Sequence, residues 1–182
     1  SSDTFSLRTA PSSFPISFGI VGDLGQTSDS LETLKHLTRD EDDFILHAGD
    51  MSYADCDGTR WDTFFDMISP FSPKFPWMVV PGNHEIEPDN ITGGVMIPYK
   101  HLYRMPWTIP SIDTTNYYQL PENNGFDCTP SAFTSSYDFG NSFYSFTIKN
   151  IAHVIALNSY TGTDETSNQF VWLRNELSEN VD

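Results

Sequence analysis

Residues 16–23 read ISFGIVGD, an apolar run that stops at a Gly-Asp pair. A run of this length that ends in a turn signal is typical of a mostly buried strand. The same pattern returns as FILHAGD over residues 44–50 and as WMVVPGNHE over residues 77–85. We therefore predict three strands, each followed by glycine and an acidic or amide side chain.

Helical patterns fill the two intervals between these strands. Asp29, with Glu32 three residues later, is a capping signal for a helix over residues 29–39. Its predicted apolar face consists of Leu31, Leu34 and Leu37. A second helix is expected to start at Thr59 and to stop at Pro70. Its apolar positions at helical spacing are Trp61, Phe64, Phe65 and Ile68.

The spacing of the strand ends fits repeated βαβ units. Asp23, Asp50 and Asn83 are 27 and 33 residues apart, which is about the size of one unit. Since such crossovers are right-handed, the three strands should be parallel. The first half of the chain is thus predicted to be an α/β unit of the βαβαβ type.

The second half changes character. Residues 87–136 are rich in Pro, Asn, Gly, Tyr and Thr, and we expect long loops there, with a short helix near residues 99–103. Apolar residues then alternate over 144–148, and a second run follows over 153–157, which predicts an antiparallel hairpin. A last helix should start near Ser167, with Phe170, Leu173 and Leu177 on its inner face.

The composition describes a folded but strongly acidic chain. Of 182 residues 38% are hydrophobic, and 9 basic residues against 25 acidic ones give a net charge of −16. This charge disfavours nucleic acid and anionic lipid as partners. No run of eighteen apolar residues is present, so we expect no membrane-spanning segment. A high acidic charge also keeps a secreted protein soluble. Composition alone favours this explanation of the charge over one that involves a particular function.

The three strand ends carry the residues that suggest chemistry. In an open parallel sheet the ligand site lies beyond the carboxyl ends of the strands, so Asp23, Asp50 and Asn83 should converge. Taken one at a time, a Gly-Asp pair after a strand is ordinary turn chemistry. Three repetitions with hard oxygen ligands instead favour a pair of metal ions, which would supply the positive charge that a phosphate substrate requires.

The motifs at these ends resemble those of a known family. GDLG at 22–25, GDMSYAD at 49–55 and GNHE at 82–85 resemble the first three motifs of the purple acid phosphatases, which are calcineurin-like metallophosphoesterases. The likeness continues through YSF at 144–146, HVIALNSY at 153–160 and QFVWLRNEL at 169–177, and it covers nearly all of the chain after Phe14. Tyr53 is the discriminating residue, because protein phosphatases and nucleotidases of the superfamily keep the Gly-Asp pair without this tyrosine.

The resemblance implies a fold and a set of ligands. The fold would be the metallophosphoesterase β-sandwich of two mixed sheets flanked by helices. Asp23 and Tyr53 would bind ferric iron, and Asp50 would bridge to a divalent iron, zinc or manganese ion bound by Asn83. His84 would act as general acid at the substrate. The implied reaction is the hydrolysis of phosphate monoesters at acid pH by a metal-bound hydroxide.

The sequence departs from the family in one respect. The family has seven protein ligands, and three of them are histidines in VxxH and GHxH motifs that do not occur here. We therefore expect residues 12–182 to be the N-terminal part of a catalytic domain, and residues 1–11 to be a linker or the end of a fibronectin-like domain. A second polypeptide or a C-terminal segment would supply the histidines. We expect little activity from the chain alone, and an exposed apolar surface where the remainder packs.

Two further features favour an oxidising compartment. Cys56 and Cys128 have no zinc-type spacing, and a disulfide between them is a hypothesis that two freely alkylated thiols would contradict. Asn90-Ile91-Thr92 is a glycosylation sequon. These features predict a secreted or extracellular protein, or alternatively a vacuolar or lysosomal one.

Two other functions remain as alternatives to an acid phosphatase. The chain could be a non-catalytic fragment that binds metal or a partner, which tight metal binding without turnover would support. It could also be a metallophosphoesterase that acts on diesters, nucleotides or phospholipids. Tyr53 argues against the latter, and a colourless protein with two zinc or manganese ions would favour it.

Overall fold

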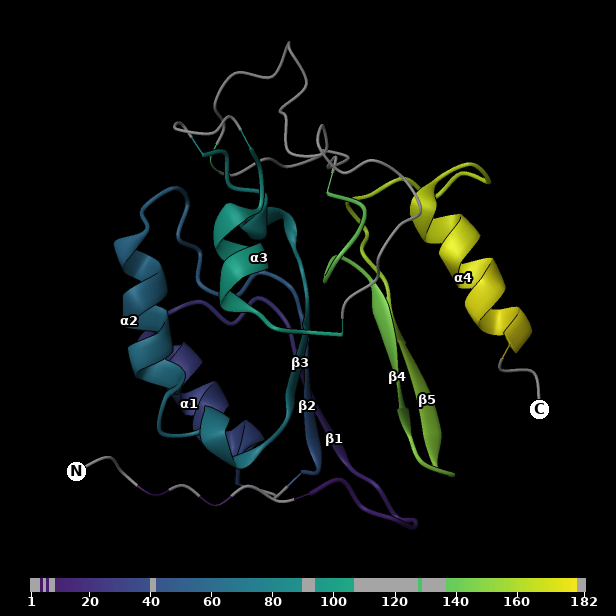
Figure 1. The fold of residues 1–182 in the computed structure, drawn as a ribbon. Coiled ribbons are helices and arrows are strands. Elements are labelled where there is room, and N and C mark those ends of the chain that lie inside the picture. Colours follow the sequence, from purple (N-terminus) through teal and green to yellow (C-terminus); the bar gives the residue numbers. More distant parts are fainter. Residues whose placement is uncertain are drawn as a thin grey trace.

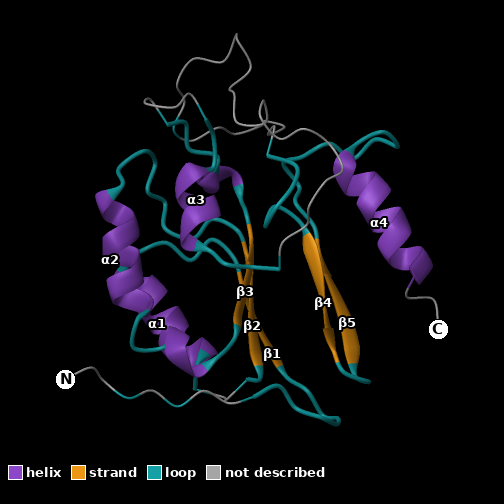
Figure 2. Cartoon of the chain, in the orientation of Figure 1, coloured by secondary structure: helices purple, strands orange, loops and turns teal. Residues whose placement is uncertain are grey.

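The structure, a computed structural model, describes residues 9–39, 42–89, 94–106 and 137–179, together with positions 4, 6 and 128. These residues form layers in which helices cover the outer sides of two facing groups of strands (Figure 1). Figure 2 shows the strands in the middle, with α1, α2 and α3 on one side and α4 on the other. In the described part of the chain no helix has the length and apolar character needed to cross a membrane.

The first sheet is parallel, as predicted. Its strands β1 (Phe18–Val21), β2 (Phe44–Ala48) and β3 (Trp77–Val80) are hydrogen-bonded in the order β1-β2-β3. The register pairs Ile20 with Leu46, and Leu46 with Met78. All three strands therefore end at the same edge of the sheet, which places the residues that follow them next to one another.

Helix α1 (Ser28–Leu37) joins β1 to β2, but its N-cap differs from the prediction. The cap is Thr27 instead of Asp29. Its side-chain oxygen accepts from the Ser30 backbone N–H at 3.1 Å, while the Ser30 hydroxyl lies 2.9 Å from the Thr27 backbone N–H. This reciprocal pair forms a capping box two residues earlier than the Asp29–Glu32 pattern, and both carboxylates are left exposed on the first turns.

Helix α2 (Thr59–Ile68) begins where the sequence predicted, and it supplies much of the core. Trp61, Phe64 and Ile68 are buried, and the ring of Phe64 meets that of Trp61 edge to face at 6.3 Å. The short 3-10 turn η1 (Ser72–Lys74) then leads into β3. A second 3-10 turn, η2 (Asn83–Glu85), follows β3 and carries the third strand-end motif.

The second half forms the predicted hairpin. Strands β4 (Tyr144–Ile148) and β5 (Ala152–Ala156) are antiparallel, with Phe146 opposite Val154. Helix α3 (Ile97–Leu102) begins two residues before the expected position. Helix α4 (Asn168–Glu179) packs through Trp172 onto Phe143 at 5.1 Å. The predicted inner position Leu177 is 50% exposed, so that prediction was wrong; at this level of α4 the contact with the hairpin is made by Glu176, which accepts from the Ser145 hydroxyl at 2.6 Å.

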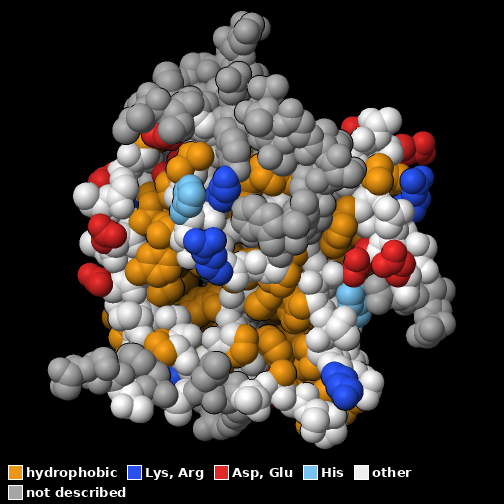
Figure 3. Space-filling model, in the orientation of Figure 1, with side chains coloured by type: hydrophobic (Ala, Val, Ile, Leu, Met, Phe, Trp, Pro, Cys, Tyr) orange, Lys and Arg blue, Asp and Glu red, His pale blue; other side chains and the backbone are white. Residues whose placement is uncertain are grey.

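The two groups of strands face each other across an apolar layer. The Tyr144 hydroxyl of β4 donates to the Val79 carbonyl of β3 at 2.8 Å, and the Phe44 and Phe146 rings lie 5.8 Å apart. A cavity of about 200 Å³ remains between β2, β3 and the hairpin. Figure 3 shows apolar side chains gathered on the face between α2 and the hairpin. Ile20 of β1 is 70% exposed and Leu157, just after β5, is 44% exposed, so apolar surface is uncovered, as expected.

The described part contains the two components predicted for this half of the sandwich, a parallel βαβαβ unit and an antiparallel hairpin followed by a helix. The three-stranded sheet is wholly parallel and the two-stranded one wholly antiparallel within the described residues.

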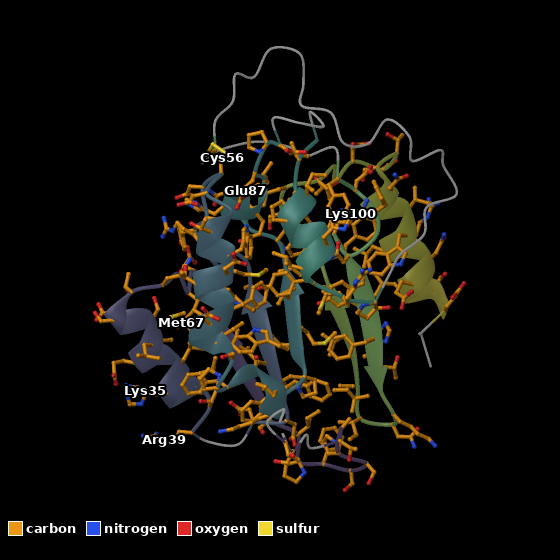
Figure 4. All side chains as sticks on the ribbon, turned by 60° about the vertical axis from the view of Figure 1, so that its left-hand side comes forward. Lys35, Arg39, Cys56, Met67, Glu87 and Lys100 are labelled. Carbon is orange, nitrogen blue, oxygen red and sulfur yellow. A yellow bond between two sulfur atoms is a disulfide. The ribbon has the colours of Figure 1, made fainter. Side chains whose placement is uncertain are left out.

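A disulfide joins Cys56 to Cys128 across 72 residues (Figure 4). The sequon residue Asn90 lies outside the described residues.

Candidate metal centre

The loops that follow β1 and β2 remain side by side beyond the strands. Backbone N–H groups of Asp23, Leu24 and Gly25 donate to the carbonyls of residues 49, 50 and 51 at 3.1, 3.0 and 2.9 Å. The parallel pairing of the sheet thus extends into the loops. Asp23 and Asp50 are held on neighbouring turns at one edge of the sheet.

Glycine lets the loops after β2 and β3 approach closely. A methyl group on Gly82 would lie 2.1 Å from Oδ1 of Asp50, and one on Gly49 would lie 2.6 Å from the Gly82 nitrogen. Gly49 also has a φ of +83°, which favours glycine. These two positions explain why glycine precedes the polar residue in both motifs.

Several residues of the site adopt left-handed backbone conformations. The φ angles of Asp23, Asp50 and Tyr53 are +52°, +53° and +50°. Such conformations cost on the order of 1 kcal/mol or more for residues other than glycine, and they concentrate at functional sites. Here each one turns a polar side chain toward the same edge of the sheet.

Asp23, Asp50 and Tyr53 form one interacting group. The Tyr53 hydroxyl donates to Oδ1 of Asp23 at 3.0 Å. Burial is the main cause that raises the pKa of Tyr53, and the hydrogen bond to Asp23 and the charge of Asp50 raise it further. Burial likewise raises the pKa of Asp50, with a further contribution from the neighbouring Asp23 carboxylate. A cation placed among these oxygens would reverse both effects.

Asn83 lies at the end of β3, and the second half of the chain reaches it. The Tyr160 hydroxyl, which follows β5, lies 3.3 Å from Oδ1 of Asn83. Burial raises the pKa of Tyr160, and the charges of Asp50 and Asp23 raise it further. Both groups of strands therefore contribute to the site.

His84 is held by three contacts from the loop after β2. Its ring Nδ1 lies 2.6 Å from Oδ1 of Asp55, and its backbone N–H donates to Oδ1 of Asp50 at 3.0 Å. The Tyr53 ring packs against the imidazole with centroids 4.1 Å apart. The imidazole is thus oriented by a carboxylate and an aromatic ring, while its Nε2 has no hydrogen bond to any described residue.

An open cavity of about 440 Å³ lies beside this group. Asp23, Tyr53 and Asp55 line one part of it, and Arg60 of α2 lies on its wall. The cavity offers room for a small anionic substrate next to the carboxylates. A guanidinium at this position suits a phosphate oxygen.

The donor set fits hard metal ions. Asp23, Asp50 and Asn83 offer carboxylate and amide oxygens, and Tyr53 offers a phenol. Among the described residues no group of three or more His, Cys, Asp or Glu side chains could hold a metal ion by itself. This agrees with the candidate ligands, because Asp23 and Asp50 are carboxylates, whereas Tyr53 and Asn83 are not among those four residue types.

Three residues of this site, Asp55, Arg60 and Tyr160, have no role predicted from the sequence. Asp55 closes the GDMSYAD motif, and its position two residues after Tyr53 was the available signal. Tyr160 ends the HVIALNSY stretch, but it is 77 residues from Asn83, so only the fold brings them together.

Comparison with known proteins agrees with this geometry. The family model described as calcineurin-like phosphoesterase matches residues 16–182. Purple acid phosphatase 22 of Arabidopsis thaliana is 36% identical over 96% of this chain, and phosphoenolpyruvate phosphatase of Allium cepa is 34% identical over 96% of it. The chain covers 34% and 32% of these two proteins, so it spans about a third of their length.

A solved structure shows the same fold. The purple acid phosphatase from yellow lupin (Lupinus luteus) seeds superposes with a TM-score of 0.66 at 20% identity, over 97% of this chain and 30% of that one. The α/β metallophosphoesterase fold predicted from the motifs is therefore confirmed. With a family match that spans residues 16–182 and purple acid phosphatases among its relatives, this chain belongs to the calcineurin-like phosphoesterase family.

Proposed function

We propose that this chain is part of an acid phosphatase that hydrolyses phosphate monoesters at a dinuclear metal centre. The observation that carries the proposal is the convergence of Asp23, Asp50 and Tyr53 at the carboxyl ends of parallel strands, where the Tyr53 hydroxyl donates to Asp23 at 3.0 Å. The relatives named above as purple acid phosphatases support it.

Each candidate ligand has a separate role in this proposal. Asp23 and Tyr53 would hold ferric iron, and Asn83 would hold a divalent iron, zinc or manganese ion. Asp50 would bridge the two metal ions. A phenolate is a hard, electron-donating ligand that suits ferric iron. The two cations supply Lewis-acid chemistry and the positive charge that a chain of net charge −16 otherwise lacks near a phosphate.

The residues around the ligands bind the substrate and move a proton. His84 donates a proton to the leaving oxygen of the ester, and Asp55, 2.6 Å from its Nδ1, orients the ring and leaves Nε2 to carry that proton. Arg60 contacts the phosphate from the cavity wall. Tyr160 orients the Asn83 amide through its 3.3 Å contact with Oδ1.

The centre requires further ligands from polypeptide outside the described residues. Four oxygen donors are too few for two metal ions, and a divalent site prefers imidazole. We propose that histidines of VxxH and GHxH motifs, on a C-terminal segment or a second polypeptide, complete the site. The uncovered Ile20 and Leu157 provide apolar surface against which that polypeptide packs.

We also propose that the protein is secreted or vacuolar. The Cys56–Cys128 disulfide supports this, because such bonds persist in oxidising compartments. Glycosylation at Asn90 belongs to the same proposal.

Hydrolysis of p-nitrophenyl phosphate at acid pH by the complete protein, with the histidine-bearing polypeptide present, tests the proposed function when it is measured before and after metal removal with a chelator. Activity should be lost with the metal, return on adding iron and zinc, and fall by at least a hundredfold in Asp50→Asn. Asp66→Asn on the exposed face of α2 is the matched control and should keep its activity. A preparation that hydrolyses bis(p-nitrophenyl) phosphate faster than the monoester would contradict the monoesterase assignment.

A further inference from the structure

Glu85 is a buried carboxylate directly behind the candidate metal site. It closes the η2 turn after β3 and is only 1% exposed. A buried carboxylate is costly unless hydrogen bonds compensate it. Its partners therefore show what the fold uses it for.

Glu85 accepts three hydrogen bonds, all from backbone N–H groups. Its Oε2 accepts from Gly82 at 2.7 Å and from Asp50 at 2.8 Å, and its Oε1 accepts from Met51 at 2.9 Å. Two of the donors belong to the loop after β2 and one to the loop after β3. A single side chain thus joins the two loops that carry Asp50 and Asn83.

The loop after β2 presents an anion-binding concavity to this carboxylate. The N–H groups of Asp50 and Met51 are successive, and the φ of Asp50 is +53°. Successive backbone N–H groups in such turns bind anions in many proteins. Here the anion belongs to the chain itself, so this concavity is filled from within and is not open to substrate.

We propose that Glu85 is a positioning residue that sets the separation of Asp50 and Asn83, and with it the metal affinity of the site. Its oxygens are engaged by backbone amides away from solvent, so the glutamate of the GNHE motif is not itself a ligand. The loop after β3, which carries Glu85, also fixes the Asp50 side chain, because the His84 backbone N–H donates to its Oδ1 at 3.0 Å. This inference rests on the proposed metal site.

Glu85→Gln tests the inference because it preserves the shape of the side chain. An amide has one oxygen and one NH₂ group. With its oxygen at the Oε2 position it loses the bond from Met51, and in the opposite orientation it loses those from Asp50 and Gly82. In either case an NH₂ group faces a backbone N–H, so the loops must separate.

Glu87→Gln is the matched control. Glu87 is 4% exposed, and its side chain accepts from the Trp61 indole N–H at 3.1 Å and from the Cys56 backbone N–H, but it has no hydrogen bond to Asp50, Met51 or Gly82. Both substitutions replace one buried acidic side chain of the same segment by its amide. A merely structural role for Glu85 predicts the same effect from both.

The measurement is Mn²⁺ binding by calorimetry on the complete protein, with the histidine-bearing polypeptide present, in the wild-type form and both variants, together with amide hydrogen exchange of the metal-free forms. We expect Glu85→Gln to weaken Mn²⁺ binding at least tenfold and to speed exchange at Asp50 and Met51, while Glu87→Gln stays within twofold of wild type. If Glu85→Gln fails to fold, Glu85→Asp, which keeps the charge but is one methylene shorter, should show the same loss of affinity.

The outcomes separate the inference from the function on which it rests. Equal Mn²⁺ affinity of wild type and a folded Glu85 variant would overturn the inference alone, as would an equal loss in Glu87→Gln. A wild-type protein that includes the histidine-bearing polypeptide and still binds no Mn²⁺ would overturn the proposed metal site and this inference with it.

Discussion

The ring Nδ1 of His84 lies 2.6 Å from Oδ1 of Asp55, although the two residues belong to loops after different strands. This pairing leaves Nε2 as the ring nitrogen available to a substrate. In an active preparation Asp55→Asn should lower kcat on p-nitrophenyl phosphate about tenfold, because the orientation of the ring is lost. His84→Ala should cost about a hundredfold, since the proton donor itself is removed.

The double variant distinguishes a dyad from two separate residues. If Asp55 acts through His84, the double substitution should cost no more than His84→Ala alone. Multiplied losses would contradict the assignment of Asp55 as the orienting partner.

Glu87 should make the metal-free protein less stable as the pH rises toward neutrality. Burial, together with the charges of Glu85 and Asp55, raises the pKa of Glu87 from 4.5 to about 7. The folded state keeps this proton up to about pH 7, whereas the unfolded chain releases it near 4.5. The free energy of unfolding should therefore fall between pH 4.5 and 7, by on the order of 2 kcal/mol from this group.

Denaturant unfolding at several pH values measures this contribution. Glu87→Gln keeps an acceptor for the Trp61 indole and should flatten the fall. Glu32→Gln, which removes an exposed carboxylate of α1, should retain it. A curve that keeps its slope in Glu87→Gln would show that another group is responsible.

The Cys56–Cys128 disulfide should contribute substantially to stability. It closes a loop of 72 residues, and a constraint of that length in the unfolded chain is worth about 2–4 kcal/mol. Figure 4 shows Cys56 and Glu87 in the same part of the molecule. The double substitution Cys56→Ser, Cys128→Ser should lower the midpoint of denaturant unfolding by a corresponding amount. Reduction of the wild type should give the same shift, and two thiols that alkylate without reduction would contradict the bond.

The elements could be predicted where a local pattern determines them. β2 and β3 have the predicted bounds because an apolar run ends at Gly49 and Pro81. The cap of α1 was misplaced since Thr27 and Asp29 both satisfy a capping pattern, and only the contact with Ser30 decides between them. Leu177 was misassigned because the adjacent Glu176, which accepts from the Ser145 hydroxyl, occupies the side of the helix that faces the hairpin.

The site, like the secondary structure, could be predicted only where a local pattern determines it. Parallel strands with equivalent ends bring Asp23 and Asp50 to one edge, and this follows from the order of elements. The contacts of Asp55, Glu85 and Tyr160 depend on how loops from different strands pack. No local pattern specifies those distances.

The absorption spectrum of the iron-loaded protein tests the central claim most directly, namely that Tyr53 and Asp23 bind iron at this edge of the sheet. Wild type and Tyr53→Phe would be compared with iron content measured on the same samples. The account predicts a visible tyrosinate–iron band in the wild type that disappears in Tyr53→Phe. A wild type that binds iron without colour, or a Tyr53→Phe variant that keeps the band, would contradict it.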